Sequence, residues 1–395
     1  MKKNDQRYLT SLVALFISTT SLYSQTTIIK SKSGENEDPS KDWSVYLKGF
    51  IQTDVMVDFQ DMSSKDGFAA PSIGFPQANS ISSNFSIKQS QVGVGVKNPN
   101  SEDGLSAYVE IDFYGPNGTT APRFRHGYIK WKKWLVGQTW SNVTDVSIFP
   151  NMFDFVGPNG TLFTRRIQVR YSTPLSKHEN LSLSLEDPNT TSITLPNDSL
   201  QWKKKSLLPA FTAVYRYGNE SSYIKLGGVV APISYERRNT TQDPYSTRTM
   251  MGYTALVSGK YDLDDSNNVR FQSTYGKGYS SGNIILDGEK YDAIPNPQNN
   301  NALETLSLFN ILGIYEHWWN PKWSSVAFYS YSQVGKKSFI PGNMFKSFQN
   351  AGLNIVFQPY KRLRFGIEGN YGNSQKFNLQ RAHGFRLQFS SSLNF

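Results

Sequence analysis

The chain has 395 residues, no cysteine and a formal net charge of +10. The absence of cysteine excludes disulfide frameworks, thiolate metal sites and thiol nucleophiles. The basic residues are spread along the sequence rather than clustered with exposed aromatic residues, which argues against a nucleic-acid-binding protein. The chain also carries 22 Tyr, 25 Phe and 8 Trp, a composition that suits the aromatic girdles of transmembrane β-barrels.

The segment 1–24 is predicted to be a signal peptide that is cleaved on export. The segment begins with a positively charged region that contains Lys2, Lys3 and Arg7. A run of apolar and small uncharged residues follows, and Ser24 provides a small residue at the cleavage point. The run is shorter than the ~20 residues that a transmembrane helix needs. The alternative is a buried N-terminal helix. The polar stretch 25–42 that follows predicts a flexible periplasmic leader.

From Trp43 onward the sequence alternates between apolar and polar residues, without a helical period. Leu105, Ala107 and Val109, for example, alternate with polar residues such as Ser106 and Glu110. This pattern is typical of strands with one apolar face. About sixteen such segments are predicted, near residues 43–59, 84–97, 104–114, 122–132, 134–142, 164–173, 180–187, 208–217, 221–236, 247–261, 267–280, 303–318, 322–333, 347–358, 361–372 and 382–395.

The links between the predicted strands alternate between short and long. Short links lie at 98–103, 262–266 and 358–361, and long polar links at 60–83, 187–207, 237–247, 281–302 and 336–346. A barrel with turns on one side and loops on the other requires this alternation. Residues 43–395 therefore predict an all-β fold, a transmembrane antiparallel β-barrel of about sixteen strands with an inward-folded constriction loop.

The final segment, 384–395, alternates strictly and ends on an aromatic residue, Phe395. This ending resembles bacterial outer-membrane barrels, in which the terminal aromatic residue forms part of the signal read by the barrel-assembly machinery. A soluble sheet can also end in Phe.

Residues 105–173 carry the most distinctive resemblance. The run RFRHGY at 123–128, followed by WLVGQTWSN at 134–142, resembles the DcaP-like outer-membrane porins. In that family a similar pair of strands precedes a long loop that folds into the pore. The resemblance implies a homotrimeric channel in the bacterial outer membrane that leans toward small carboxylated anions.

The predicted constriction loop spans about 143–161. It is rich in bulky apolar residues for a solvated loop, and the inner wall of a barrel offers a surface for them. The alternative is a surface loop packed at a trimer interface. The residues predicted to matter in it are Asp145, Phe149, Phe153, Asp154 and Phe155.

A basic wall is predicted on the lumen side. Alternation places arginines on the polar face of several strands, and arginines facing lipid would cost ~2–4 kcal/mol each near the midplane. Glu110, Asp112 and Glu368 face the same way, so the alternative is that they neutralise the arginines. Asp145 and Asp154 are predicted to form an opposing acidic edge. The predicted basic wall comprises Arg123, Arg125, Arg166, Arg170, Arg270, Arg362 and Arg364.

Catalysis finds little support in the sequence. The histidines His126, His178, His317 and His383 are far apart and lack metal-ligand spacing. Neither a nucleophile motif nor a phosphate-binding loop is present, and no cofactor or metal is predicted.

The sequence therefore predicts an outer-membrane porin, a passive diffusion channel for small hydrophilic solutes that favours anions such as carboxylates. Its predicted partners are outer-membrane lipid, small anionic solutes, two further copies of the chain and the barrel-assembly machinery, with no nucleic acid. The alternatives are an outer-membrane barrel with an enzymatic or structural role, and a soluble secreted carbohydrate-binding β-protein.

Overall fold

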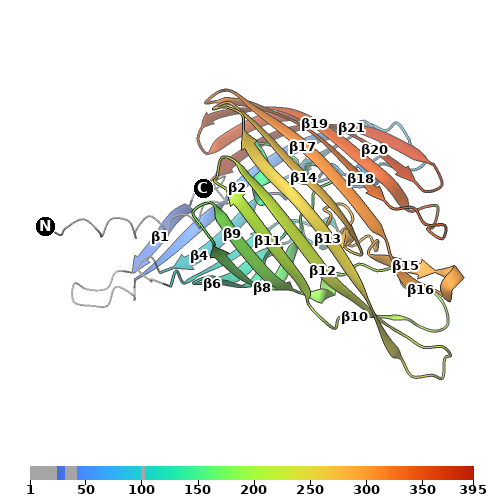
Figure 1. The fold of residues 1–395 in the computed structure, drawn as a ribbon. Helices are drawn as coiled ribbons and strands as arrows, with labels where there is room; N and C mark the ends of the chain where they lie inside the picture. The colour runs from blue at the N-terminus through green and yellow to red at the C-terminus, as the bar shows by residue number, and fades with distance from the viewer. Residues whose placement is uncertain (1–24, 32–41, 99–102) are drawn as a thin grey trace.

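The computed structural model describes residues 25–31, 42–98 and 103–395, which form a closed antiparallel β-barrel of sixteen strands. Figure 1 shows the strands tilted across the wall of the barrel. The predicted fold class is confirmed. The predicted signal peptide lies outside the described residues.

The sixteen barrel strands are β2 (Trp43–Asp58), β4 (Gln91–Lys97), β5 (Ser106–Asp112), β6 (Arg123–Trp131), β7 (Trp134–Trp140), β8 (Arg165–Pro174), β9 (Glu179–Glu186), β11 (Ala210–Gly218), β12 (Tyr223–Arg237), β13 (Ser246–Asp262), β14 (Asn267–Lys277), β17 (Ser307–Asn320), β18 (Trp323–Val334), β19 (Phe345–Tyr360), β20 (Leu363–Lys376) and β21 (Arg381–Asn394).

Five further strands extend or decorate the barrel: β1 (Gln25–Ser31), β3 (Ser82–Ser86), β10 (Lys203–Lys205), β15 (Ala293–Asn296) and β16 (Ala302–Thr305). The described helices are single 3-10 turns, η4 (Ala70–Ser72), η5 (Pro116–Gly118), η6 (Val146–Ile148), η7 (Pro188–Thr190), η8 (Ser280–Gly282) and η9 (Pro297–Asn299). Within the described ranges, no helix is long and apolar enough to cross a membrane.

Strand alternation turns apolar side chains outward and polar ones inward. In β2, Ile51 on the outer face is 58% exposed, whereas Gln52 and Asp54 on the lumen face are 1% and 3% exposed. In water this pattern would be inverted, because apolar surface is buried where possible. Here lipid is the outer solvent, and the ladder of a closed barrel satisfies every strand's backbone groups.

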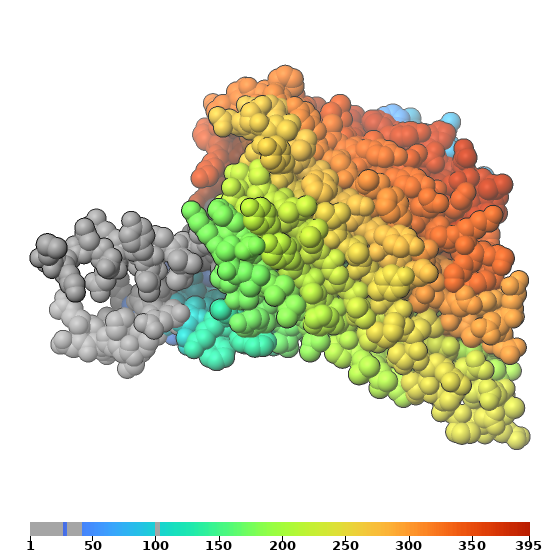
Figure 2. All heavy atoms as spheres, in the orientation of Figure 1, coloured from blue at the N-terminus to red at the C-terminus, as the bar shows by residue number. Residues whose placement is uncertain are grey.

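The short turns gather at one end of the barrel, the turn end, and the long loops at the other, the loop end. Exposed aromatic residues flank the short turns, where amphipathic rings anchor a barrel at the membrane interface. They are Trp131, Trp134, Tyr217, Tyr261, Trp319, Trp323 and Tyr360. Figure 2 shows the outer wall over β9–β20 as a continuous surface, with the β12–β13 hairpin projecting from the loop end.

The barrel closes between its first and last strands. β2 pairs with β21 from Asp58↔Arg386 to Phe50↔Asn394, and the backbone of Phe395 then pairs with Gly49. β1 continues the same ladder without a gap, starting at Gln25↔Lys48.

The predicted flexible leader, 25–42, is therefore wrong for 25–31, while 32–41 lie outside the described residues. Beyond Phe395, β2 would have unpaired backbone groups along this edge, and β1 satisfies them. Alternation over seven residues is too weak a signal to show this in the sequence.

Replacing 25–31 by a Gly/Ser segment of the same length is expected to lower the heat stability of the barrel. Gly and Ser weaken strand pairing, so the β2 edge would be exposed to water at the seam. The temperature at which the folded band disappears on a semi-native gel should fall by a few degrees. An unchanged temperature would show that β1 adds nothing to closure.

Two predicted strands differ in detail. The segment 84–97 is interrupted at 87–90, so that β3 pairs with the loop-end half of β2 and β4 with its turn-end half. The segment 303–318 begins too early, because Ala302–Thr305 pair with β15 in a separate hairpin. Both corrections reflect local pairing that alternation alone does not reveal.

The wall of the barrel is uneven in height. The barrel strands from β4 to β9 have 7–10 residues and form the low wall, whereas the barrel strands from β12 to β21 have 11–17 residues and form the high wall. Three of the loops turn back into the lumen: L1 (59–81), L3 (141–164) and L6 (278–306).

Candidate functional site: the constriction of the barrel

Loop L3 lies along the inner wall of the barrel and crosses most of its circumference. Its backbone N–H groups donate to lumen-facing side chains of six different strands. These bonds are Asn142 to Glu186, Asn151 to Glu316, Phe153 to Glu368, Asn159 to Asn350, Gly160 to Ser330 and Leu162 to Gln272, with N···O distances of 2.6–3.1 Å. A buried loop must satisfy its backbone donors in this way.

Three buried carboxylates, Glu186, Glu316 and Glu368, have a structural role in this arrangement. Each accepts a hydrogen bond from the L3 backbone, and each is 1–3% exposed. Of the three, the sequence analysis names only Glu368, as an inward-facing acid that could neutralise the lumen arginines. Their buried acceptor oxygens hold the loop against the wall, and Glu316 in addition pairs with Arg270.

L1 forms a second layer over L3, which the sequence analysis did not predict. Phe68 is fully buried, and its backbone N–H donates to Asp154 at 2.8 Å. The ring lies against Gly372 of β20, where a Cβ atom would come within 2.7 Å of it. Met62 lies against Gly384 of β21 in the same way. Glycines inside strands often mark such close approaches. Gly372 and Gly384 are therefore the residues from which the inward position of L1 could have been predicted.

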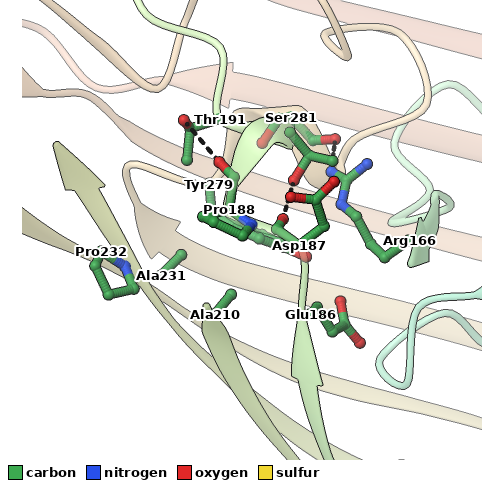
Figure 3. Close-up of a pocket in the computed structure, with 11 residues that line it drawn as sticks. Arg166, Glu186, Asp187, Pro188, Thr191, Ala210, Ala231, Pro232, Tyr279 and Ser281 are labelled. Atoms are coloured by element: carbon green, nitrogen blue, oxygen red, sulfur yellow. Dashed lines mark hydrogen bonds between the residues drawn. The ribbon is translucent and has the colours of Figure 1, made fainter. Parts of the chain in front are cut away.

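L6 completes the constriction. The backbone N–H of Ile284 donates to Thr161 of L3 at 3.0 Å, and that of Phe163 donates to Gly282 of L6 at 2.9 Å. Arg166, predicted in the basic wall, points toward L6 and donates to the carbonyl of Ser281 at 2.8 Å (Figure 3). Its side chain is 4% exposed. It therefore fixes a loop rather than facing solute.

Figure 3 also shows a small pocket between Arg166, the start of the loop after β9, and the wall. Its volume is about 10 Å³, roughly the space of one water molecule. The pocket is thus part of the packing around L6 and has no room for a solute.

Two predicted arginines on β6 are paired with acids on β5. Arg123 binds Asp112 through two bonds of 2.9 and 2.7 Å, and Arg125 bridges Glu110 and Asp112 at 2.9 Å each. A β-bulge at Arg125 lets both Arg125 and His126 face the lumen. For this pair of arginines the structure adopts the pairing alternative, and the acids offset part of their charge.

Arg270 and Arg364 face the lumen but contact L3. Arg270 pairs with Glu316 and donates to the carbonyl of Phe149. Arg364 donates to the side chain of Asn151 at 2.6 Å and lies over the ring of Phe153 at 4.8 Å.

Arg362, also predicted in the basic wall, does not line the pore. It lies in the turn 361–362 between β19 and β20, where its side chain is exposed. The sequence prediction began the strand two residues too early, and a side chain in a turn has no assigned face.

Arg170 faces the lumen, as does Arg165, which the sequence analysis missed. Arg170 donates to the side chain of Gln168 at 2.8 Å and to the carbonyl of Trp140. Arg165 lies over the ring of Trp140 at 5.2 Å. In the part of the chain that the structure describes, neither arginine forms an ion pair with a carboxylate.

The predicted acidic edge of the loop is wrong in its orientation. Asp145 accepts hydrogen bonds from Tyr223 and Ser258 of the barrel wall. Asp154 accepts from the backbone N–H groups of Phe68 and Gly157 at 2.8 and 2.7 Å. The two residues are 4% and 5% exposed. Burial, with the nearby carboxylate of Glu368, raises the pKa of Asp154 to about 6.

The three predicted phenylalanines have different positions. Phe153 is buried against Gly366 of β20 and anchors the loop. Phe149 and Phe155 are half-buried, and they contact Phe163 and Tyr114 with ring centroids 4.7 and 4.2 Å apart.

The charge of the constriction follows from these contacts. Four arginines, Arg123, Arg125, Arg165 and Arg170, lie on the low wall, where they face two acids, Glu110 and Asp112. These six side chains together carry a net charge of +2. In the opposing loop both acids are buried, Asp145 against the barrel wall and Asp154 against L1 and the backbone of L3.

The chain is similar to known proteins in both sequence and fold. The family model described as DcaP outer membrane protein matches residues 22–395. Among solved structures, the outer membrane channel DcaP of Acinetobacter baumannii superposes with a TM-score of 0.77 at 21% identity, over 94% of this chain and 100% of that one.

More distant structures share the fold. The anion-selective porin from Comamonas acidovorans gives a TM-score of 0.57 at 10% identity, over 89% of this chain and 100% of its own. OmpT of Vibrio cholerae gives 0.56 at 11%, over 91% and 98%. No curated protein matches the chain.

Proposed function

Because the chain belongs to the DcaP outer membrane protein family, we propose that this outer-membrane porin is a passive diffusion channel for small hydrophilic solutes with a preference for anions. The proposal includes export through a cleaved signal peptide of 24 residues, and L3 as the constriction loop. It also includes assembly as a homotrimer and recognition of Phe395 by the barrel-assembly machinery.

One observation carries the anion preference. Arg165 and Arg170 lie beside the constriction without an ion-pair partner among the described residues, while Asp145 and Asp154 of the loop are buried. Pores select ions by their diameter and by the charges that line them. Guanidinium groups also match carboxylates in geometry, which supports carboxylates as solutes. The Comamonas acidovorans porin, which shares this fold, is anion-selective, and this agrees with the proposal.

A passive channel rather than an enzyme fits the site. The polar side chains near the constriction form hydrogen bonds or ion pairs with one another or with the backbone of the loops. His126 is buried, and its Nδ1 is hydrogen-bonded to the hydroxyl of Thr139 at 3.0 Å. Such groups shape and charge a passage without the exposed nucleophile and base that hydrolysis needs.

In a planar bilayer under a KCl gradient, the purified protein is expected to show stepwise conductance with a reversal potential that indicates chloride preference. The double variant Arg165→Gln/Arg170→Gln should move the reversal potential toward that of a cation-preferring pore, because it removes two arginines beside the constriction that form no ion pair with the carboxylates of the described residues. Arg362→Gln is the matched control, since Arg362 lies in an exposed turn; it should leave the reversal potential unchanged.

Two other outcomes would count against the proposal. Cation preference of the parent protein would contradict the anion preference while leaving the channel in place. An equal shift in the double variant and in Arg362→Gln would show that overall charge, not the constriction, sets selectivity.

A further inference from the structure

The outer face of the β12–β13 hairpin changes from apolar to polar toward the loop end. Val230 and Met251 are 43% and 52% exposed on this face. The next outward pair beyond Met251, Ser234 with Thr249, is polar. The two strands have 15 and 17 residues, more than the ~9–11 that cross a bilayer. The end of the hairpin therefore projects from the hydrocarbon layer (Figure 2), and Ser234 lies at the level of the lipid headgroups.

Two lysines of β10 lie at this boundary. Lys203 pairs with Glu236 of β12, and Lys205 pairs with Ser234. Directly opposite residues in a sheet share a face, so both lysines belong to the outer face. The Nζ of Lys205 donates to the carboxylate of Glu236 at 2.6 Å, which agrees with this placement. The short strand thus adds two cations where the outer wall becomes polar.

Lys203 shares an aromatic ring with a second cation. Its Nζ lies 4.3 Å from the ring centroid of Tyr245, and the guanidinium carbon of Arg238 lies 5.1 Å from the same centroid. In the described part of the chain neither cation forms an ion pair with a carboxylate, and Asp243 of the same loop accepts instead from the backbone N–H of Thr240. The ring attracts both cations, but two like charges beside one ring repel each other. An anion bound between them would offset this repulsion.

The surroundings of these cations match a membrane lipid. Exposed lysines on loops usually serve solubility alone. Here, however, Leu207 and Leu208 follow closely in the chain, and each is 52% exposed. A lipid presents an anionic headgroup directly beside its acyl chains, so it can contact such cations and such apolar side chains together. We refer to the surface as the outer basic patch, which comprises Lys203, Lys205, Arg238 and Tyr245.

We propose that the outer basic patch binds the phosphate groups of a glycolipid in the outer leaflet. Lys203 and Arg238 hold a phosphate beside the ring of Tyr245, and the acyl chains lie against the exposed apolar residues of the wall. Both cationic groups form strong, charge-assisted bonds to phosphate. The long loops of an outer-membrane barrel face the exterior, so the headgroup belongs to the outer leaflet. This inference concerns the outer wall and is independent of which solutes pass the constriction.

The test is a titration of the protein, purified in detergent and freed of bound lipid, with lipid A that carries two phosphates. Native mass spectrometry measures the bound fraction, and saturable binding to the parent protein is expected. Lys203→Glu should weaken the apparent affinity about 20- to 30-fold. The substitution changes the patch by two charges, and one charge near an anionic lipid surface is worth roughly 5-fold.

Two further variants separate the patch from overall charge and from folding. Lys361→Glu is the matched control, because Lys361 is equally a surface lysine but lies in a turn at the opposite end of the barrel; its affinity should equal that of the parent. Lys203→Arg keeps the charge and should also bind like the parent. Heat-dependent gel mobility and single-channel conductance check that each variant is folded.

Several results would overturn the proposal. Absence of binding to the parent, or an equal loss in Lys361→Glu, would show that the patch is no lipid site. Equal affinity for lipid A without phosphates would exclude recognition of the headgroup. Displacement of the lipid by an equimolar amount of inorganic phosphate would show that free phosphate, not lipid, is the ligand. Each of these results leaves the conductance of the channel, and therefore the proposed function, untouched.

Discussion

Replacing residues 145–161 by a short Gly/Ser linker is expected to raise the single-channel conductance about twofold or more, because conductance follows the open cross-section of a pore. L3 is held by side chains of six strands, so it occupies the lumen permanently. Its removal opens the space between the low wall and the high wall. Stepwise currents in symmetrical KCl measure the change directly.

The shortened variant also separates the loop from the wall as a source of selectivity. Arg165 and Arg170 belong to β8 and stay in place, so chloride preference should persist in weaker form in the wider pore. L1 and L6 lose their contacts with L3, and they are expected to become accessible to protease at the loop end. Conductance equal to that of the parent would show that the current does not pass the constriction.

Arg386→Met is expected to destabilise the folded barrel by ~3–5 kcal/mol, the usual cost of leaving one member of a buried ion pair alone. The side chain of Arg386 is 0% exposed; its Nε donates to Asp58 at 2.6 Å, and its Nη2 donates to the carbonyl of Ser64 at 2.6 Å. The pair joins β21 to β2 at the seam, and it also holds L1. Loss of the arginine strands the buried Asp58 carboxylate.

The unfolding of Arg386→Met in urea, followed by the fraction of folded band, measures this cost. The double variant Asp58→Leu/Arg386→Met should recover much of the stability, because neither charge is then left unpaired. Lys65 lies 3.4 Å from Asp58, and its side chain is 40% exposed. In the single variant it offsets part of the Asp58 charge, so it sets the lower end of the expected loss of stability. A single variant as stable as the parent would rule out the seam pair as a determinant of stability.

The sequence predicted the barrel well because lipid and lumen impose opposite demands on alternate residues. Sixteen alternating segments matched the sixteen strands, and the position of L3 followed from its aromatic content. Pairing between side chains of neighbouring strands, in contrast, could not be predicted from the sequence. Arg123 and Asp112 are 11 residues apart in the chain, and nothing in either strand alone shows that they meet.

The direction of side chains at strand ends is the second feature that alternation did not predict. Alternation places Arg165 on the same face as Ile167, which is 55% exposed to the outside. At the first position of β8, however, Arg165 turns over the ring of Trp140. Arg362 shows the converse error, because its predicted face depended on a strand boundary that lies two residues later.

The many anchors of L3 have a consequence for the order of folding. The loop follows β7 in the chain, yet its hydrogen-bond partners extend from Glu186 to Glu368, which lies in the penultimate strand. L3 therefore cannot make all its native contacts until nearly the whole chain has joined the wall. A growing barrel holds this loop without its partners, and the narrow passage forms only as the last strands arrive and the seam between β2 and β21 closes.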